Sequence, residues 1–344
     1  MSANFGVEPL ASPSSASTKT IEETTGPTHQ LFLPEPIAAP VDSNDDDNDE
    51  TTSNDATSPL VICFHGSGES CSPSWDALIR SLVTGTTDAA APHHRLRVLA
   101  FERGPDNPKP AQATADLLAY LQAGGDATRP PYVLVAHSYG GAFARTFLEE
   151  VDDDDKTHVA GMVLVETGQE GGLAAGLEER QYRRRVLGHR PLSVVRGNSL
   201  MGVEAQIAEL EGREATTEVE RQGLRGRREM LGVWDREDER LKRRQLQLSR
   251  RKAPKRYVHI PDCGHHVVRD RPDVVAAEVA WVVENMGKGD GMHDDAGEDE
   301  EEEEEESAEG GGSEAEKGDR GWEKIRRIWK GVVETLVGRL RGLR

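Results

Sequence analysis

The chain has 344 residues, with 62 acidic and 42 basic side chains, so its formal net charge is −20. Most of this excess lies in two stretches: residues 42–55 hold seven acids and no base, and residues 290–319 hold sixteen acids and one lysine. The remainder is nearly neutral, which argues against nucleic-acid binding and against steering of a cationic substrate by bulk charge.

Cysteine content and the first residues bear on the compartment. Three cysteines are an odd number, in a chain long enough to need no disulfide framework. The amino terminus shows no basic region followed by an apolar stretch, and no segment reaches the length of a membrane-spanning helix. We therefore expect a cytoplasmic protein without a secretory signal.

The composition changes sharply along the chain. Residues 1–58 are rich in Ser, Thr, Pro and Asp, which bury too little apolar surface to offset the entropy lost on ordering, so we expect a disordered leader. From residue 59 to residue 287, β-branched runs alternate with helical patterns. This alternation predicts an α/β domain with a mostly parallel sheet flanked by helices. Residues 288–319 are expected to form an acidic disordered linker.

Strands and helices can be placed within the expected domain. The strands are short and apolar, as strands covered on both faces should be: Pro59–Phe64, Arg97–Phe101, Tyr132–Ala136, Ala160–Val165, Leu192–Arg196 and Lys255–Ile260. Helices are expected where apolar residues recur at spacings of three and four: Trp75–Leu82, Ala111–Leu121, Gly141–Glu149 and Pro272–Glu284. Two charged stretches, Gly176–Arg190 and Leu200–Arg251, also have a helical pattern and could either cover a site or remain solvated.

The first expected strand runs into a glycine-rich loop, His65-Gly-Ser-Gly. Such a loop can direct a backbone N–H toward an oxyanion that develops during acyl transfer. The residue after the nucleophile commonly supplies the second N–H. The expected oxyanion-binding amides are therefore those of Ser67 and Tyr139.

The segment Pro130-Pro-Tyr-Val-Leu-Val-Ala-His-Ser-Tyr-Gly-Gly reads as a buried strand, a tight turn of small residues and then a helix. A serine at such a turn projects its Oγ from a sharp bend near a helix N-terminus. The usual pattern is Gly-x-Ser-x-Gly, and Ala136 stands here for the first glycine. Ser138 is the expected nucleophile.

A catalytic serine needs a histidine base and an acid that orients the histidine. Near the end of the domain, Asp262-Cys-Gly-His265-His follows the last expected strand, and we take His265 as the base in preference to His266. We favour Glu166 as the acid because it ends a strand, where catalytic loops cluster. Asp235 and Asp238, further along the chain, remain alternatives.

Taken together and in this order, these segments resemble the α/β-hydrolase superfamily, in its branch of esterases with a serine nucleophile. The resemblance covers about residues 59–287 and departs from the usual Asp-Arg-x-Gly at Glu102-Arg103-Gly-Pro. It implies hydrolysis of a small ester-like substrate through an acyl-enzyme, without cofactor or metal. A catalytically silent binding domain or an acyltransferase is the alternative, and the oligomeric state is not indicated.

The last 25 residues carry a separate pattern. In residues 320–344, apolar side chains recur at spacings of three and four, and Lys and Arg occupy the opposite face. A basic amphipathic helix of this kind can lie in an anionic membrane interface, or it can dock on the domain or on the acidic stretches of the same chain. We expect such a helix, with peripheral membrane contact as one of its possible roles.

Overall fold

The computed structural model describes residues 18–20, 29–34, 58–85, 95–103, 109–151, 159–168, 172–174, 176–212 and 218–288. Two units can be separated, Met1–Gly289 and Asp290–Arg344, and every described residue belongs to the first. The expected terminal helix at 320–344, and all but residue 288 of the acidic linker, lie outside the described residues and stay predictions.

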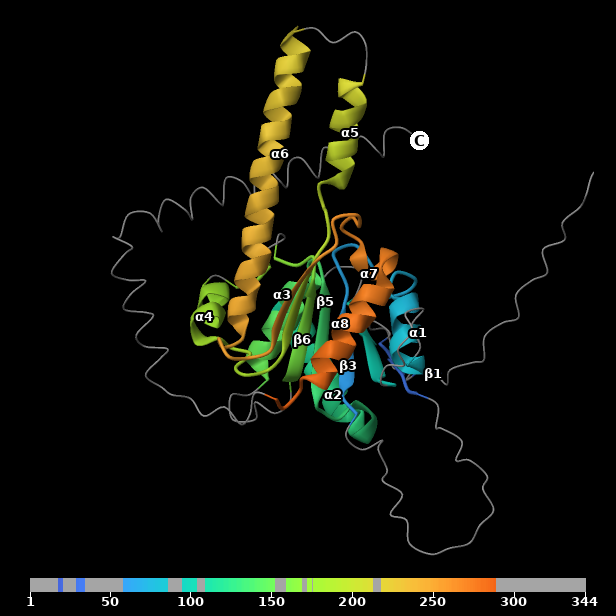
Figure 1. Ribbon diagram of the computed structural model, residues 1–344. Coiled ribbons are helices and arrows are strands. Elements are labelled where there is room, and N and C mark those ends of the chain that lie inside the picture. Colours follow the sequence, from blue (N-terminus) through green and yellow to red (C-terminus); the bar gives the residue numbers. More distant parts are fainter. Residues whose placement is uncertain are drawn as a thin grey trace, which may run out of the picture. The chain divides into compact units, whose positions relative to one another are not determined.

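One eight-stranded sheet runs through the first unit in the order β1-β2-β4-β3-β5-β6-β7-β8 (Figure 1). Six strands, β3 to β8, are parallel to one another, while β1 and β2 add to the β4 edge in antiparallel pairing. The strands are β1 (Thr18–Thr20), β2 (Gln30–Phe32), β3 (Leu60–Phe64), β4 (Arg97–Phe101), β5 (Tyr132–His137), β6 (Val159–Val165), β7 (Leu192–Arg196) and β8 (Lys255–His259).

Helices cover both faces of the sheet, as parallel crossovers require. One apolar cluster joins the sheet to α2 and α3, and a second joins its opposite face to α1 and α8. The helices are α1 (Asp76–Thr84), α2 (Pro110–Ala123), α3 (Gly140–Glu150), α4 (Leu177–Arg184), α5 (Met201–Glu211), α6 (Glu218–Arg244), α7 (Val267–Asp270) and α8 (Pro272–Glu284); short 3₁₀ turns are η2 (Gly125–Thr128) and η4 (Gln245–Leu248).

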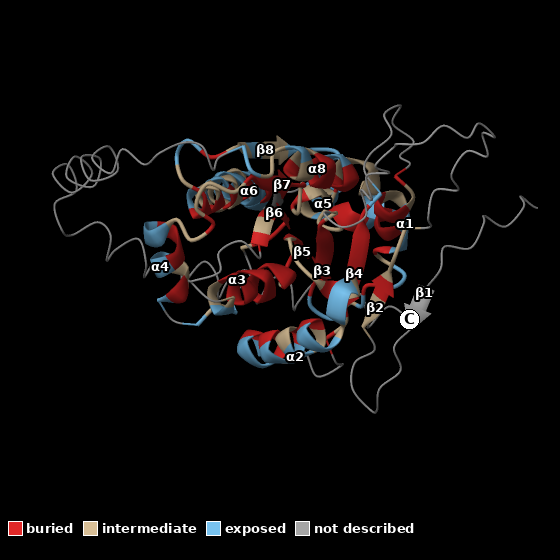
Figure 2. Ribbon diagram, turned by 90° about the horizontal axis from the view of Figure 1, so that it is seen from below, coloured by how far each residue is buried: buried red, intermediate tan, exposed pale blue. Residues whose placement is uncertain are grey.

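Strand β3 shows how the sequence builds this three-layer arrangement. Its five residues are all buried, and successive side chains enter opposite clusters: Leu60, Ile62 and Phe64 on the α3 face, Val61 and Cys63 on the α8 face. Figure 2 shows buried residues through the central strands and the sheet-facing sides of α3 and α8. Because both faces of a central strand are covered, its sequence is a continuous apolar run rather than an alternation of apolar and polar residues.

The expected α/β-hydrolase-like fold, a mostly parallel sheet flanked by helices, is confirmed. Each of the six strands and four helices placed from sequence is present, with ends that differ by at most two residues. Strand β8 departs from the expectation of burial on both faces, because it is the edge strand and none of its residues is buried. Its position explains its more polar sequence, Lys-Arg-Tyr-Val-His.

Two strands lie within the leader that we expected to be disordered. Strand β2 pairs with β4, with Leu31 opposite Leu99, and the Leu31 side chain is 1% exposed. Ordered structure therefore includes residues before Pro59, which was not expected from the sequence. Three-residue strands are too short for a hydrophobic period to be recognised, and β2 is held by its neighbour in the sheet rather than by a pattern of its own.

The charged stretches at 176–190 and 200–251 contain α4, α5 and α6, as their helical pattern indicated. Helices α5 and α6 contact each other and extend together away from the carboxyl ends of the strands (Figure 1). We call them the α5–α6 hairpin. Within the described part of the chain, no helix combines the length and apolar character that crossing a bilayer would require.

Candidate active site

Ser138 lies at the bend between β5 and α3, in the middle of the sheet. Its φ of 54° is in the left-handed region, which a non-glycine residue adopts only when the surroundings enforce it. The Ser138 amide donates to the Val165 carbonyl at 3.0 Å, and a Cβ on Gly140 would lie 2.1 Å from the Phe64 carbonyl oxygen. The bend therefore requires a glycine at position 140 and holds the serine Oγ outward.

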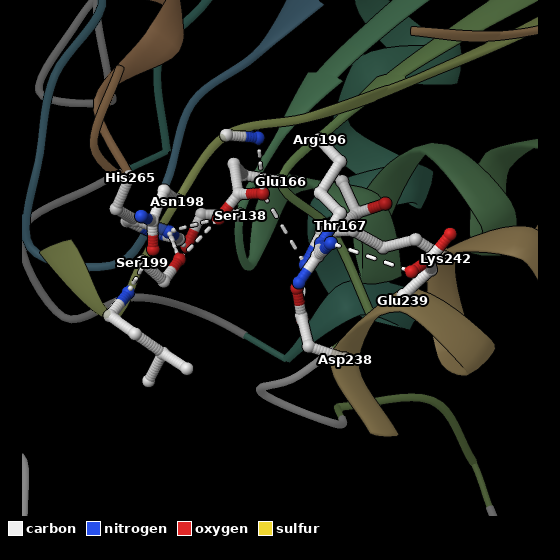
Figure 3. A network of polar contacts seen from close by, with 12 residues as sticks. Ser138, Glu166, Thr167, Arg196, Asn198, Ser199, Asp238, Glu239, Lys242 and His265 are labelled. Carbon is white, nitrogen blue, oxygen red and sulfur yellow. Dashed lines mark hydrogen bonds and ion pairs between the residues drawn. The ribbon is translucent and has the colours of Figure 1, made fainter. Parts of the chain in front are cut away.

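The side chains of Ser138, His265 and Glu166 form a chain of hydrogen bonds (Figure 3). His265 Nε2 is 3.0 Å from Ser138 Oγ, and His265 Nδ1 is 3.1 Å from Glu166 Oε2. With an ionised carboxylate, Nδ1 carries the proton and donates it, so Nε2 is free to accept the serine proton. All three residues follow parallel strands at the same edge of the sheet.

Glu166 is completely buried at the end of β6, and its φ of 52° is also left-handed. Its Oε1 accepts the Gly197 amide at 2.8 Å, and its Oε2 accepts the hydroxyl of Ser199 as well as the His265 proton. Ser199 Oγ also lies 3.3 Å from His265 Nδ1. These donors fix the carboxylate and, through it, the plane of the imidazole.

The two alternative acids take other partners. Asp238 accepts from Arg196 Nε at 2.8 Å, and Asp235 contacts the same guanidinium. Both aspartates belong to α6, whereas the histidine ring faces Glu166. Among the three carboxylates considered from sequence, only Glu166 has a described contact with His265.

The two residues whose amides are expected to bind an oxyanion, Ser67 and Tyr139, both belong to segments that lie close to the serine. A Cβ on Gly66 would lie 3.3 Å from Ser138 Cβ, so the loop that carries Ser67 passes directly against the nucleophile. Tyr139 stands at the N-terminus of α3. No hydrogen bond from either amide to a backbone carbonyl is found among the described residues, which is compatible with the expected role of both amides.

A sequence profile described as "Alpha/beta hydrolase family" matches residues 61–278, which is more than half of the chain and spans the serine, the glutamate and the histidine. The chain belongs to the alpha/beta hydrolase family. No curated protein matches it at a significant level.

Solved structures similar to this alpha/beta hydrolase are distant in sequence. They include a dienelactone hydrolase from Anabaena variabilis (14% identity, covering 78% of this chain and 98% of that one, TM-score 0.42) and Est1E from Butyrivibrio proteoclasticus (12%, 78% and 98%, 0.41). The Pyrococcus furiosus esterase PF2001 is similar at 11% identity, with 78% and 91% coverage and a TM-score of 0.45.

A second histidine–carboxylate group supports the loop that carries His265. His137 Nε2 hydrogen-bonds the His265 carbonyl at 2.8 Å, and Glu69 lies 3.5 Å from His137 Nδ1 and 3.0 Å from His266 Nδ1. Interactions with His137 and His266 hold the pKa of Glu69 well below its usual range. This group joins the end of β5 to the loops after β3 and β8.

His65 fixes the glycine-rich loop from its other side. The ring is 2% exposed and hydrogen-bonds the Gly66 carbonyl at 2.9 Å, while Arg103 donates to that carbonyl at 2.6 Å. Burial, reinforced by the charge of Arg103, lowers the pKa of His65 to about 4. His65 is therefore neutral near pH 7, and it stabilises the loop without chemistry of its own.

The electrostatics of Glu166 depend on a lysine that sequence reasoning missed. Burial is the largest single influence on Glu166 and would raise its pKa. The charge of Lys242 and the interactions with His265 and Ser199 together outweigh burial, so the pKa lies well below its usual range. Glu166 is therefore ionised at neutral pH. No group of three or more His, Cys, Asp or Glu side chains with metal-binding geometry occurs in the described residues.

Nothing in the sequence marked Lys242, which sits in a stretch of Arg, Glu and Leu without a local motif. Glu69 was equally inconspicuous, although it lies four residues after His65 in the same loop. Ser199 had a weak signal, since Arg196-Gly-Asn-Ser follows a strand at the place where family members can carry their acid. Here that position supports the acid with a hydroxyl instead.

Proposed function

We propose that the protein is a serine hydrolase that cleaves an ester or related acyl bond through an acyl-enzyme. The observation that carries this proposal is the uninterrupted hydrogen-bonded chain from Ser138 through His265 to Glu166, at the strand-to-helix bend of an alpha/beta hydrolase. Family membership supports a hydrolase in general. The ester class is supported by a serine nucleophile with the expected oxyanion-binding residues, Ser67 and Tyr139, beside it.

The mechanism proceeds in two halves. Ser138 Oγ attacks the substrate carbonyl while His265 Nε2 takes its proton, and the Ser67 and Tyr139 amides stabilise the oxyanion. His265 then returns the proton to the leaving alkoxide. Water, deprotonated by His265, hydrolyses the acyl-enzyme and frees Ser138. Glu166 orients the imidazole and stabilises its protonated form throughout, without accepting the proton.

Two other roles are compatible with the same scaffold. An acyltransferase would use an alcohol or amine in place of water, since fold and triad do not specify the acceptor. A binding protein would keep the fold without the chemistry. The hydrogen-bonded serine favours an active enzyme over the binding protein, because a silent domain has no need of a nucleophile in strained backbone.

A fluorophosphonate probe tests whether the serine is activated. The wild-type chain should be labelled once per molecule, Ser138→Ala should not be labelled, and Ser70→Ala, at an exposed serine of the neighbouring loop, should be labelled like wild type. Absence of labelling in the wild type, or equal labelling of Ser138→Ala, would contradict the proposal.

A panel of p-nitrophenyl esters of increasing acyl length then tests the reaction class. Release of p-nitrophenol that depends on Ser138 supports ester cleavage. If an added alcohol diverts most of the acyl group into a new ester, the acyltransferase alternative is correct instead. If the serine reacts with the probe but no acyl ester turns over, the ester class is wrong.

A further inference from the structure

Lys242, in the last turns of α6, is fully buried and contacts the acid of the proposed triad. Its Nζ lies 3.4 Å from Glu166 Oε1, and it also contacts Asp238 one turn earlier (Figure 3). We propose that Lys242 is a positioning residue of the active site, which fixes the Glu166 carboxylate and controls proton uptake by the Glu166–His265 pair through its charge. The inference rests on the proposed function.

The two carboxylate oxygens of Glu166 have different partners. Oε2 faces the chemistry, where it accepts from His265 and Ser199, and Oε1 faces the scaffold, where it meets the Gly197 amide and Lys242. A carboxylate held on both sides cannot rotate about its last bond. The cation therefore contributes to the orientation of the imidazole without touching it.

The positive charge of Lys242 still acts on Glu166, although a second carboxylate lies beside the lysine. Asp238 of α6 shares it, but Asp238 is also bound by Arg196 of β7. That guanidinium further contacts Asp235 and Glu239, the remaining carboxylates of the α6 network. On the other side, Glu166 is faced by His265 from the loop after β8. Of these groups, Lys242 is the only cation in direct contact with Glu166.

Removal of a positive charge favours proton uptake by whatever lies beside it. In a coupled pair the first proton is shared between the two sites. Loss of the positive charge therefore favours binding of this proton whether it resides on the imidazole or on the carboxylate. An opposite charge within this distance typically shifts a carboxyl titration by about 1–3 pH units. Without Lys242, the active form with ionised Glu166 and neutral His265 should appear only at higher pH.

The experiment measures the rate of fluorophosphonate labelling of the full chain against pH. For Lys242→Met, the acid limb of the profile should move to higher pH by about one unit or more, whereas Lys242→Arg, which keeps the charge, should stay near wild type. Asp238→Asn removes the opposing charge, so its acid limb should move to lower pH. Lys109→Met, at an exposed lysine before α2, is the matched control and should leave the profile unchanged.

A purely structural lysine would lower labelling at every pH without moving the limb, and that result would overturn the inference. The inference would also be overturned if the acid limb moved in the same direction in Lys242→Met and in Asp238→Asn. Should Lys242→Met not fold, as circular dichroism would reveal, the opposite shift of Asp238→Asn decides the matter, because an unmoved limb in that variant contradicts the proposal.

Failure of the proposed function is recognised separately. It shows as a wild-type chain that does not label at any pH. In that case, NMR titration of the His265 imidazole in Ser138→Ala, with and without Lys242→Met, still measures the effect of the lysine on the pair. An unchanged titration midpoint would then sink the inference independently of catalysis.

Discussion

Ser138 and Glu166 share an unusual backbone conformation. Both are non-glycine residues with left-handed φ angles, 54° and 52°, and both directly follow a parallel strand. Such conformations cost on the order of 1–3 kcal/mol and persist only where the surroundings enforce them. Among the described non-glycine residues, Arg185 at the C-terminal cap of α4 is the third with a left-handed φ. The other two both contact His265, which ties their backbone cost to the geometry of the site.

Replacement of Glu166 by glutamine should show what the charge of this side chain contributes, apart from its volume. Glu166→Gln keeps the volume but removes the charge, so the imidazole loses its orienting acceptor and Lys242 loses a buried partner. We expect kcat/KM for an ester to fall by about three orders of magnitude and the free energy of unfolding to fall by about 3 kcal/mol. Ester kinetics and urea denaturation measure the two effects.

The control for this substitution is Ser138→Ala, which should abolish activity while leaving the free energy of unfolding close to wild type. If Glu166→Gln lost activity without losing stability, the buried ion pair would be weaker than its 3.4 Å contact indicates. If it lost neither, Glu166 would not be the acid.

His65 predicts a specific dependence of stability on pH. Its folded-state pKa of about 4 lies below the ordinary value of 6.5, so the unfolded chain binds a proton more readily than the folded one. Its contribution to stability is therefore full above pH 6.5 and is lost as the pH falls toward 4, by up to about 3 kcal/mol. His65→Gln should show a correspondingly smaller loss of unfolding free energy between pH 7 and pH 4 in urea titrations. An identical slope in both proteins would exclude this role.

The predictable part of the site is the part with local sequence signatures. Ser138 sits in a strand-turn-helix motif, and His265 follows a glycine after the last strand. Glu166 could be favoured only by its place at a strand end. The supporting residues could not be predicted, because Lys242 reaches the site from a helix 76 positions further along the chain and such a contact has no local signal.

At the scale of the elements, the bend after β5 depends on a close approach to β3. A Cβ on Gly140 would fall 2.1 Å from the Phe64 carbonyl oxygen and 2.8 Å from that of His65, and both are backbone atoms that cannot turn aside. The helix α3 can begin where it does only because residue 140 has no side chain.

Gly140→Ala should therefore destabilise the protein by about 3 kcal/mol and reduce fluorophosphonate labelling of the remaining folded protein. The matched control is Gly202→Ala in α5, where an added Cβ meets no atom within 4 Å. Helix propensity predicts that this control is neutral or stabilising by up to about 1 kcal/mol. Thermal unfolding of both variants distinguishes a steric requirement from general sensitivity to substitution, which equal losses would indicate.

Central strands were predictable because they are buried on both faces and read as continuous apolar runs. Every one of the four helices placed from sequence has apolar residues at helical spacing that pack on the sheet. The extent of α6 was not predictable. Its charged sequence, with three glycines, indicated a helix within residues 200–251 but not where the helix begins and ends, and in the structure α6 contacts α5 and Arg196.

At the scale of the whole molecule, the folded domain begins earlier in the chain than the residues that the family profile matches. The profile starts at residue 61, whereas Leu31 of β2 is already buried against the sheet. The strand extends the sheet beyond β4 and covers what would otherwise be an open edge. Part of the chain that composition alone marked as a leader is thus part of the fold.

Leu31→Ala should lower the free energy of unfolding by about 2–3 kcal/mol, because it leaves a cavity beside β4. Met230→Ala, at a side chain that is 47% exposed on α6, is the matched control and should change stability by less than about 0.5 kcal/mol. Urea denaturation of the full chain measures both. Equal stability of Leu31→Ala and wild type would mean that the segment before residue 58 contributes nothing to the domain.

The described contacts of the long helix α6 with Arg196 and Glu166 come from residues near its carboxyl end, among them Asp235, Asp238 and Lys242. For protein engineering, this divides the α5–α6 hairpin into two modules. The distal module, residues 201–234, is the part in which an exchange, deletion or fusion would leave these contacts in place. The proximal module, from Asp235 onward, has to be inherited intact if a chimaera is to keep the contacts of α6 with Arg196 and Glu166.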